Sequence, residues 1–235
     1  MENIPGYVSI TFICTVIATF GFIYYAITVR ADKNSNVPTM VVTFLLVWIF
    51  AISILTFYGF FRDFDSSPPR FLYLILPPLL LILSVLIHPG GRSFLKKLPL
   101  TTLTYIHIVR VPVEIVLWWL SIEKVIPSIM TFEGMNYDIL SGISAPFAGI
   151  FLVGLRSKSK IGAFIWNLLA FVLVVNIIYR AIASTPYFFD AASFEYPNIA
   201  VFYFPYVLLP AFIVPSILFS HLVSFYRLLT DREEY

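Results

Sequence analysis

Seven apolar stretches, most of them about twenty residues long, restrict what this chain can fold into. A helix needs about 20 mostly apolar residues to cross a bilayer, and in lipid every backbone polar group must be bonded internally. The stretches cover residues 7–29, 38–61, 71–88, 99–122, 139–155, 162–183 and 200–226. We therefore predict an all-α, polytopic integral membrane protein, a single bundle of seven transmembrane helices formed by residues 1–235.

The composition supports a membrane protein over a soluble one. The chain is 60% hydrophobic and only 12% charged, whereas a soluble domain carries roughly 25% charged residues. We expect a multi-pass protein of a cell membrane, of the kind found in a bacterial inner membrane, with the lipid bilayer as its first partner. The net charge of +2 gives no signature of a nucleic-acid partner.

Lysine and arginine residues predict how the bundle is oriented. Most of them follow the first, third, fifth and seventh stretches: Arg30, Lys33, Arg92, Lys96, Lys97, Arg156, Lys158, Lys160, Arg227 and Arg232. The loops on the other side hold only Arg62, Arg70 and Lys124. Because cytoplasmic loops carry an excess of lysine and arginine, we expect the C-terminus in the cytoplasm and the N-terminus outside.

The stretch 99–122 carries ionisable side chains at bilayer depth. His107, Arg110 and Glu114 fall within roughly a 60° arc of one helix face, and Trp118 continues that face. Charges inside a membrane are costly and usually mark a functional site. Arg110 and Glu114 have the i, i+4 spacing that allows them to pair.

A second polar patch, formed by Asn176, Tyr179 and Arg180, lies in the stretch 162–183. Two arginines against one glutamate leave one positive charge uncompensated within the spans. Glu133 and Asp138, in the loop between the fourth and fifth stretches, are candidates to balance it, and so is a bound anion.

Structural explanations of these charges stay open. A buried Arg–Glu pair can simply lock two helices together, and Arg180 is close enough to the outer surface to extend its charge into water. Other polar features also favour architectural roles. Pro112 should break the hydrogen bonding near Ile108, and the stripe Ser141, Ala145 and Gly149 should allow close helix packing.

Several function classes find no support in the sequence. The three histidines have no metal-ligand spacing, and Cys14 is the single cysteine, so we expect no metal and no cofactor. His88 and His221 are expected at the cytoplasmic ends of helices, in interfacial or capping positions. All six lysines lie outside the spans, which excludes a retinal Schiff base. The basic turn 88–97 is expected to attract lipid headgroups.

The leading functional hypothesis is binding or transport of a small polar, anionic solute through an outward-opening pocket. Its predicted ligand-binding residues are Arg110, Glu114, Arg180, His107, Trp118, Asn176 and Tyr179. One alternative is an intramembrane enzyme acting on a lipid-like substrate, with His107 or Glu114 as acid and base. Another is a non-catalytic membrane subunit whose charges meet a partner's helix, and a homo-oligomer stays open as well.

Overall fold

The computed structural model of the protein describes residues 4–31, 35–154, 159–190 and 192–230, and these residues form helices and turns without a β-strand. The predicted all-α class is therefore confirmed for the described part of the chain. Four of the basic residues used to orient the bundle lie outside it: Lys33, Arg156, Lys158 and Arg232.

Nine α-helices follow one another in the described residues, with short 3-10 or π segments between some of them. The α-helices are α1 (Gly6–Thr28), α2 (Val37–Phe57), α3 (Leu72–Ile87), α4 (Pro89–Lys97), α5 (Leu100–Tyr105), α6 (Arg110–Ile122), α7 (Ile139–Ala148), α8 (Lys160–Ala183) and α9 (Val214–Thr230). The 3-10 segments are η1 (Phe60–Arg62), η2 (Ile106–Val109), η3 (Ser128–Met130) and η5 (Ala200–Phe202). The π segments are η4 (Gly149–Val153) and η6 (Leu209–Ile213).

Five helical segments of the described chain are long and apolar enough to cross a membrane. They are Gly6–Thr28, Val37–Phe57, Leu100–Ile122, Lys160–Ala183 and Leu209–Thr230. A sixth is reached if α3 and α4, which meet at 92°, count as one broken span. The apolar segment Ile139–Val153 is shorter.

Among the seven predicted helices, the last has bounds that differ most from those in the structure. Residues 200–226 were expected to form one helix, but the continuous helical segment begins at Leu209 and ends at Thr230. Pro205 and Pro210 lack the backbone N–H that a helix interior requires. The residues before Leu209 instead form η5 and a turn, and all three residues of η5 are buried.

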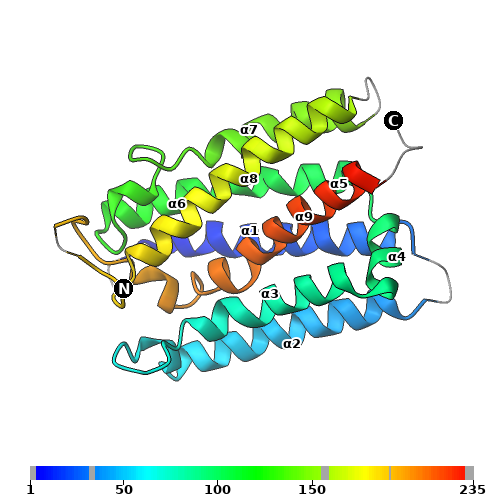
Figure 1. Ribbon diagram of the computed structural model, residues 1–235. Coiled ribbons are helices and arrows are strands. Elements are labelled where there is room, and N and C mark those ends of the chain that lie inside the picture. Colours follow the sequence, from blue (N-terminus) through cyan, green and yellow to red (C-terminus); the bar gives the residue numbers. More distant parts are fainter. Residues whose placement is uncertain (1–3, 32–34, 155–158, 191, 231–235) are drawn as a thin grey trace.

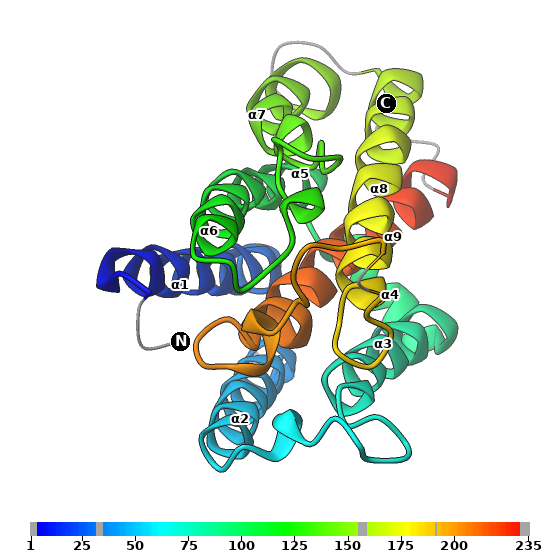
Figure 2. The same ribbon diagram turned by 90° about the vertical axis from the view of Figure 1, so that its left-hand side faces the viewer.

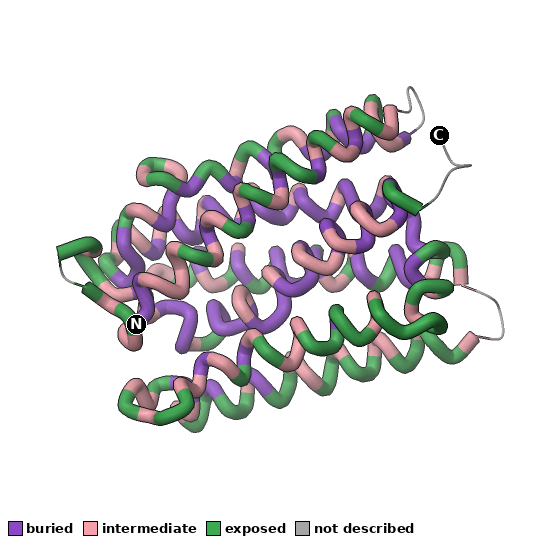
Figure 3. Tube along the Cα trace, in the orientation of Figure 1, coloured by how far each residue is buried: buried purple, intermediate pink, exposed green. Residues whose placement is uncertain are grey.

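Apart from α4, the helices run roughly along one direction, with α9 near the middle of the bundle (Figures 1 and 2). Together with η6, α9 contacts α1, α2, α3, α4, α5 and α8. Buried residues are concentrated in these inner helices, whereas the residues of α2 are exposed along most of its length (Figure 3). A large exposed apolar surface of this kind is what a helix facing lipid presents.

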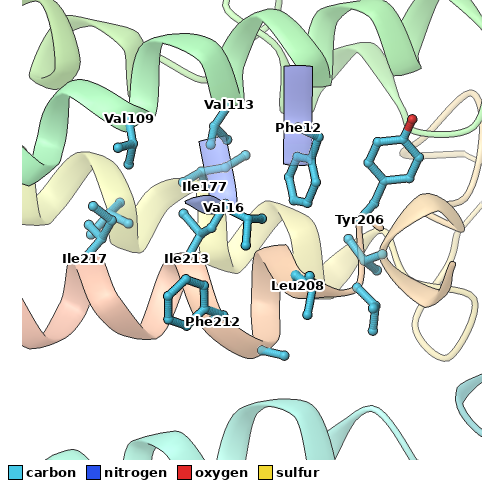
Figure 4. Close-up of a cluster of buried hydrophobic side chains, with 14 of the residues drawn as sticks. Phe12, Val16, Val109, Val113, Ile177, Tyr206, Leu208, Phe212, Ile213 and Ile217 are labelled. Carbon is cyan, nitrogen blue, oxygen red and sulfur yellow. The ribbon is translucent and has the colours of Figure 1, made fainter. Parts of the chain in front are cut away.

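An apolar cluster joins α1, the α5–α6 segment, α8 and α9 near the centre of the bundle (Figure 4). Its labelled members are Phe12, Val16, Val109, Val113, Ile177, Tyr206, Leu208, Phe212, Ile213 and Ile217. The cluster fixes the positions of the helices that carry the buried polar residues described next.

Small residues let α7 approach its neighbours closely, as their spacing predicts. Ser141 and Ala145 are buried, and a Cβ added to Gly149 would collide with the ring of Tyr105. A Cβ added to Gly142 would lie 2.7 Å from Val111 Cγ2 and 3.0 Å from the Val111 backbone nitrogen. This close approach places the start of α7 beside the start of α6.

Candidate functional site

Arg110 is the centre of a buried polar network. Its guanidinium pairs with Asp138 through both carboxylate oxygens, with Nε 2.6 Å from Oδ2 and Nη2 on Oδ1. Nη2 also donates to the carbonyl of Ala170, at 3.0 Å. The Arg110 side chain is almost fully buried, so the carboxylate of Asp138 neutralises its charge in the interior of the bundle.

The local backbone explains how Arg110 reaches this position. Pro112 has no N–H to bond the carbonyl of Ile108, and the helix tightens into η2 just before Arg110. There the Arg110 N–H bonds the carbonyl of His107, three residues earlier, as a 3-10 turn requires. The irregularity predicted from Pro112 therefore directs Arg110 toward α7 and α8.

Two histidines lie beside the guanidinium. The ring centroids of His107 and His221 are 4.2 Å apart, and Arg110 Nη1 lies 3.4 Å from His107 Nδ1 and 3.4 Å from His221 Nε2. Arginine only donates hydrogen bonds, so both of these ring nitrogens act as acceptors. The opposite nitrogens then donate, from His107 Nε2 to Ser220 Oγ at 3.1 Å and from His221 Nδ1 to Asn167 Oδ1 at 2.7 Å.

All five N–H groups of Arg110 therefore have acceptors within the protein. Nε and one hydrogen of Nη2 face Asp138, the second hydrogen of Nη2 faces Ala170, and Nη1 faces the two imidazoles. A guanidinium has five donors and no acceptor. No donor is left over for an additional anion.

Glu114 lies one turn further along α6 and is 1% exposed. Its Oε1 accepts a hydrogen bond from Asn136 Nδ2, at 2.6 Å, and Asn136 Oδ1 in turn accepts the Asp138 N–H, at 3.1 Å. Its Oε2 is buried without a hydrogen-bond partner. Arg110 thus takes Asp138 as its ion-pair partner in place of Glu114, because Asp138 offers it both carboxylate oxygens.

A cavity of about 130 Å³ adjoins this network. Arg110, Glu114 and Asp138 form its only charged lining, and the remaining walls are mainly aliphatic side chains from α3, α6, α8, η6 and α9. Small-molecule sites are usually apolar cavities of this type, with a few polar groups that fix orientation. The cavity and the unpartnered oxygen of Glu114 together form the candidate site.

The structure brings three of the seven predicted ligand-binding residues together: His107, Arg110 and Glu114. The other four are not part of the cavity lining. Arg180 Nε donates to Asn176 Oδ1, at 3.0 Å, on a part of α8 that lies about 15 Å beyond Ala170 at about 1.5 Å per residue. Tyr179 is 72% exposed, and Trp118 packs against Phe132.

The prediction for one of the two remaining histidines was wrong. His88 caps a helix as predicted, because its Nδ1 accepts the Gly90 N–H at the start of α4. His221, expected near a cytoplasmic helix end, is instead fully buried beside Arg110. α9 continues to Thr230, about 13 Å beyond His221 at about 1.5 Å per residue.

Asn167, Ser220 and Asn136 complete the network and were not predicted. Asn167 is a lone polar residue inside an apolar stretch, and Ser220 directly precedes His221, and these positions are the sequence signals that mark them. Within the described ranges, no group of three or more His, Cys, Asp or Glu side chains lies in a position to hold a metal ion.

Two loops cover the end of the bundle nearest Glu114, and they are bonded to one another. The Ser128 hydroxyl and N–H donate to the carboxylate of Glu195, at 2.8 and 3.2 Å, and these bonds hold the pKa of Glu195 below its ordinary value. The Ile199 N–H also donates to the carbonyl of Val125, at 3.1 Å. The two loops at this end of the bundle therefore hold each other in place.

The fold and the site together define an all-α protein with several helices long and apolar enough to cross a membrane, and with a buried polar network and an adjoining cavity inside its helices. The chain belongs to a family described as a domain of unknown function, DUF8737, which matches residues 69–229. The matched range runs from the turn before α3 to the end of α9 and contains every residue of the network. No curated protein and no solved structure matches the chain.

Proposed function

We propose that the protein crosses a cell membrane seven times, with its N-terminus outside. The five long segments account for five of these crossings, and α3 and Ile139–Val153 would provide the other two. An odd number of crossings is supported by the start of α1 and the end of α9, which lie at opposite ends of the bundle (Figure 1). The excess of lysine and arginine at the α9 end supports the orientation.

Cysteine labelling in intact cells tests this topology. In a Cys14→Ala background, a cysteine at Ser66 should react with a membrane-impermeant thiol reagent, and one at Ser159 should react only after the cells are opened. The two positions lie in loops at opposite ends of the bundle. Labelling of Ser159→Cys from outside would reverse the orientation, and equal labelling of both would require an even number of crossings between them.

We further propose that the cavity binds a small molecule with an apolar body and one amine or ammonium group. The observation that carries this proposal is Glu114 Oε2, a buried carboxylate oxygen without a partner in the lining of an otherwise apolar cavity. A buried acceptor left unbonded is costly, so a ligand donor at this position gains affinity. An ammonium group would also balance the Glu114 charge, because Arg110 and Asp138 already neutralise each other.

This assignment changes the ligand class proposed from the sequence while keeping a role in solute binding or transport. An anion would have to displace one of the five acceptors of Arg110, whereas a donor meets a free acceptor at Glu114. Buried carboxylate and histidine networks are typical of membrane pathways for ions and solutes. The subunit alternative has less support, because the charged groups face the interior of the bundle.

The enzyme alternative also has less support from the geometry. His107 does not line the cavity, and its two ring nitrogens are held by Arg110 and Ser220. An acid or base must lie within hydrogen-bond reach of the group that it protonates. Of the two carboxylates that line the cavity, Glu114 has an oxygen without a partner, whereas both oxygens of Asp138 bond Arg110.

Thermal unfolding of the purified protein in detergent separates these ligand classes. Hexylamine, hexanol and hexanoate present the same apolar chain with a cationic, neutral or anionic end. We expect hexylamine to raise the melting temperature with increasing concentration, because a ligand that binds only the folded state stabilises it. Hexanol should act weakly and hexanoate should not act.

Two matched variants make the result specific to the site. Glu114→Gln keeps an oxygen for Asn136 but removes the charge, so it should abolish the hexylamine shift. Glu133→Gln is the same change at an exposed position and should leave the shift intact. If hexanoate raises the melting temperature and Arg110→Gln removes that rise, the anion hypothesis is restored. If no probe changes the melting temperature, the polar network has a structural role only.

A further inference from the structure

The short helix α4 leaves α3 at 92° and lies across the end of the bundle (Figure 1). The residues of the basic turn build this bend. His88 caps α4 through the Gly90 N–H, and Arg92 Nε donates to the carbonyl of Leu86 at the end of α3, at 2.9 Å. A Cβ on Gly91 would collide with the carbonyl oxygen of Val85. The turn itself is therefore occupied by structural contacts.

α4 has the two faces of a helix that lies at a membrane surface. Leu95 is fully buried against the bundle and Phe94 is half-buried, whereas Lys96 and Lys97 are exposed. Helices with an apolar face and a lysine-rich face lie in the plane of the headgroups. α4 thus belongs at the level where phosphates are found.

A cavity of about 160 Å³ lies between α4, the end of α1 and the start of α2. Its lining includes the polar residues Arg30, Ser35, Ser93 and Lys97, together with Gly90. Two basic residues and two hydroxyl-bearing residues around one small space form a combination that suits a phosphate group.

A second cavity, of about 310 Å³, lies beside the first. Ile27 and Phe94 line both cavities. Its other walls come from α1, α2, α3, η6 and α9 and are almost entirely apolar. Within this lining, Trp48 donates its indole N–H to the carbonyl of Ala211, at 2.9 Å, and so connects α2 to η6.

We propose that these two neighbouring cavities bind one anionic phospholipid. Its phosphate lies against Arg30, Ser93 and Lys97, and one acyl chain lies in the apolar cavity between α2 and α3. A cavity with basic lining residues beside an apolar cavity matches the charge pattern of such a lipid along its length. The site is separate from the Glu114 cavity and does not depend on the function proposed for it.

Lipid binding to the delipidated protein, counted by native mass spectrometry, tests the headgroup contact. Phosphatidylglycerol should bind in one copy more tightly than phosphatidylcholine with the same acyl chains. The double variant Arg30→Gln/Lys97→Gln should weaken phosphatidylglycerol binding by about tenfold or more, since each basic residue near a membrane surface contributes to anionic-lipid affinity. Lys96→Gln, next to Lys97 but outside the cavity lining, should change binding by less than about twofold.

A second pair of variants tests the acyl-chain contact. Val41→Trp fills the apolar cavity and should weaken binding of both lipids, whereas Val47→Trp, on a different groove of α2, should not. Glycerol phosphate, which has no acyl chain, should neither compete nor raise the melting temperature. The proposal is overturned if the double variant behaves like Lys96→Gln, if Val41→Trp behaves like Val47→Trp, or if glycerol phosphate competes with the lipid.

Discussion

Replacing Asp138 with alanine should lower the free energy of unfolding by about 3–5 kcal/mol, the usual cost of removing one partner of a buried ion pair. The loss is large because Arg110 would keep its charge among helices where no other carboxylate bonds it. Chemical or thermal denaturation in a mild detergent measures the effect. Glu133→Ala, an exposed carboxylate on the same loop, should change stability by no more than about 0.5 kcal/mol.

Replacing both partners should be far less harmful than replacing one. In Arg110→Met/Asp138→Leu no charge is left uncompensated, and apolar side chains of similar size fill the space, so most of the stability should return. If Asp138→Ala is instead as mild as Glu133→Ala, Arg110 has another partner in the protein. Coupling between Arg110 and Glu114, expected from their i, i+4 spacing, would then be the first alternative to measure.

Much of the site could be anticipated from the spacing of residues along a single helix. A rotation of about 100° per residue places His107, Arg110 and Glu114 on one face, and the structure brings these three together. The count of charges within the spans also indicated that Asp138 was a candidate counter-ion. Both arguments use local geometry or simple charge balance, which a sequence contains.

The ion-pair partner of Arg110 depends on tertiary contacts, so the spacing of residues along the sequence could not identify it. Asp138 pairs with Arg110 because α7 approaches η2 closely, and Gly142 permits that approach. The same limit explains Arg180, which has the right charge and the right helix but is not part of the cavity lining, although its neighbours Ala181 and Ile182 are. His221 and Asn167 meet only because α8 and α9 pack on one another.

The helical stretches were predicted more successfully than their ends. Apolar runs show which segments are helical, because the pattern is long and uniform. The start of the last helix depended instead on prolines and on the packing of η5 beneath the loops. The bend between α3 and α4 likewise required contacts from His88, Arg92 and Gly91 that composition alone does not specify.

The same glycine-to-alanine change should have opposite effects at two helical positions. Gly142→Ala should destabilise the protein by about 1–3 kcal/mol, the usual cost of overpacking. Its new Cβ would lie 3.0 Å from the Val111 backbone nitrogen and 3.2 Å from the His107 carbonyl, which cannot easily move. In Gly21→Ala the new Cβ meets nothing within 4 Å, and alanine favours a helix over glycine by up to about 1 kcal/mol.

Gly142→Ala should also disturb the site, because Asp138 lies one turn before Gly142 on α7. Moving α7 outward lengthens the contact between Asp138 and Arg110, so the variant should lose part of the stability that the ion pair provides. In an Arg110→Met/Asp138→Leu background that part is already absent, and Gly142→Ala should cost less. An equal cost in both backgrounds would mean that Gly142 supports helix packing alone, and a stabilising Gly142→Ala would mean that α7 is not held against η2 as described.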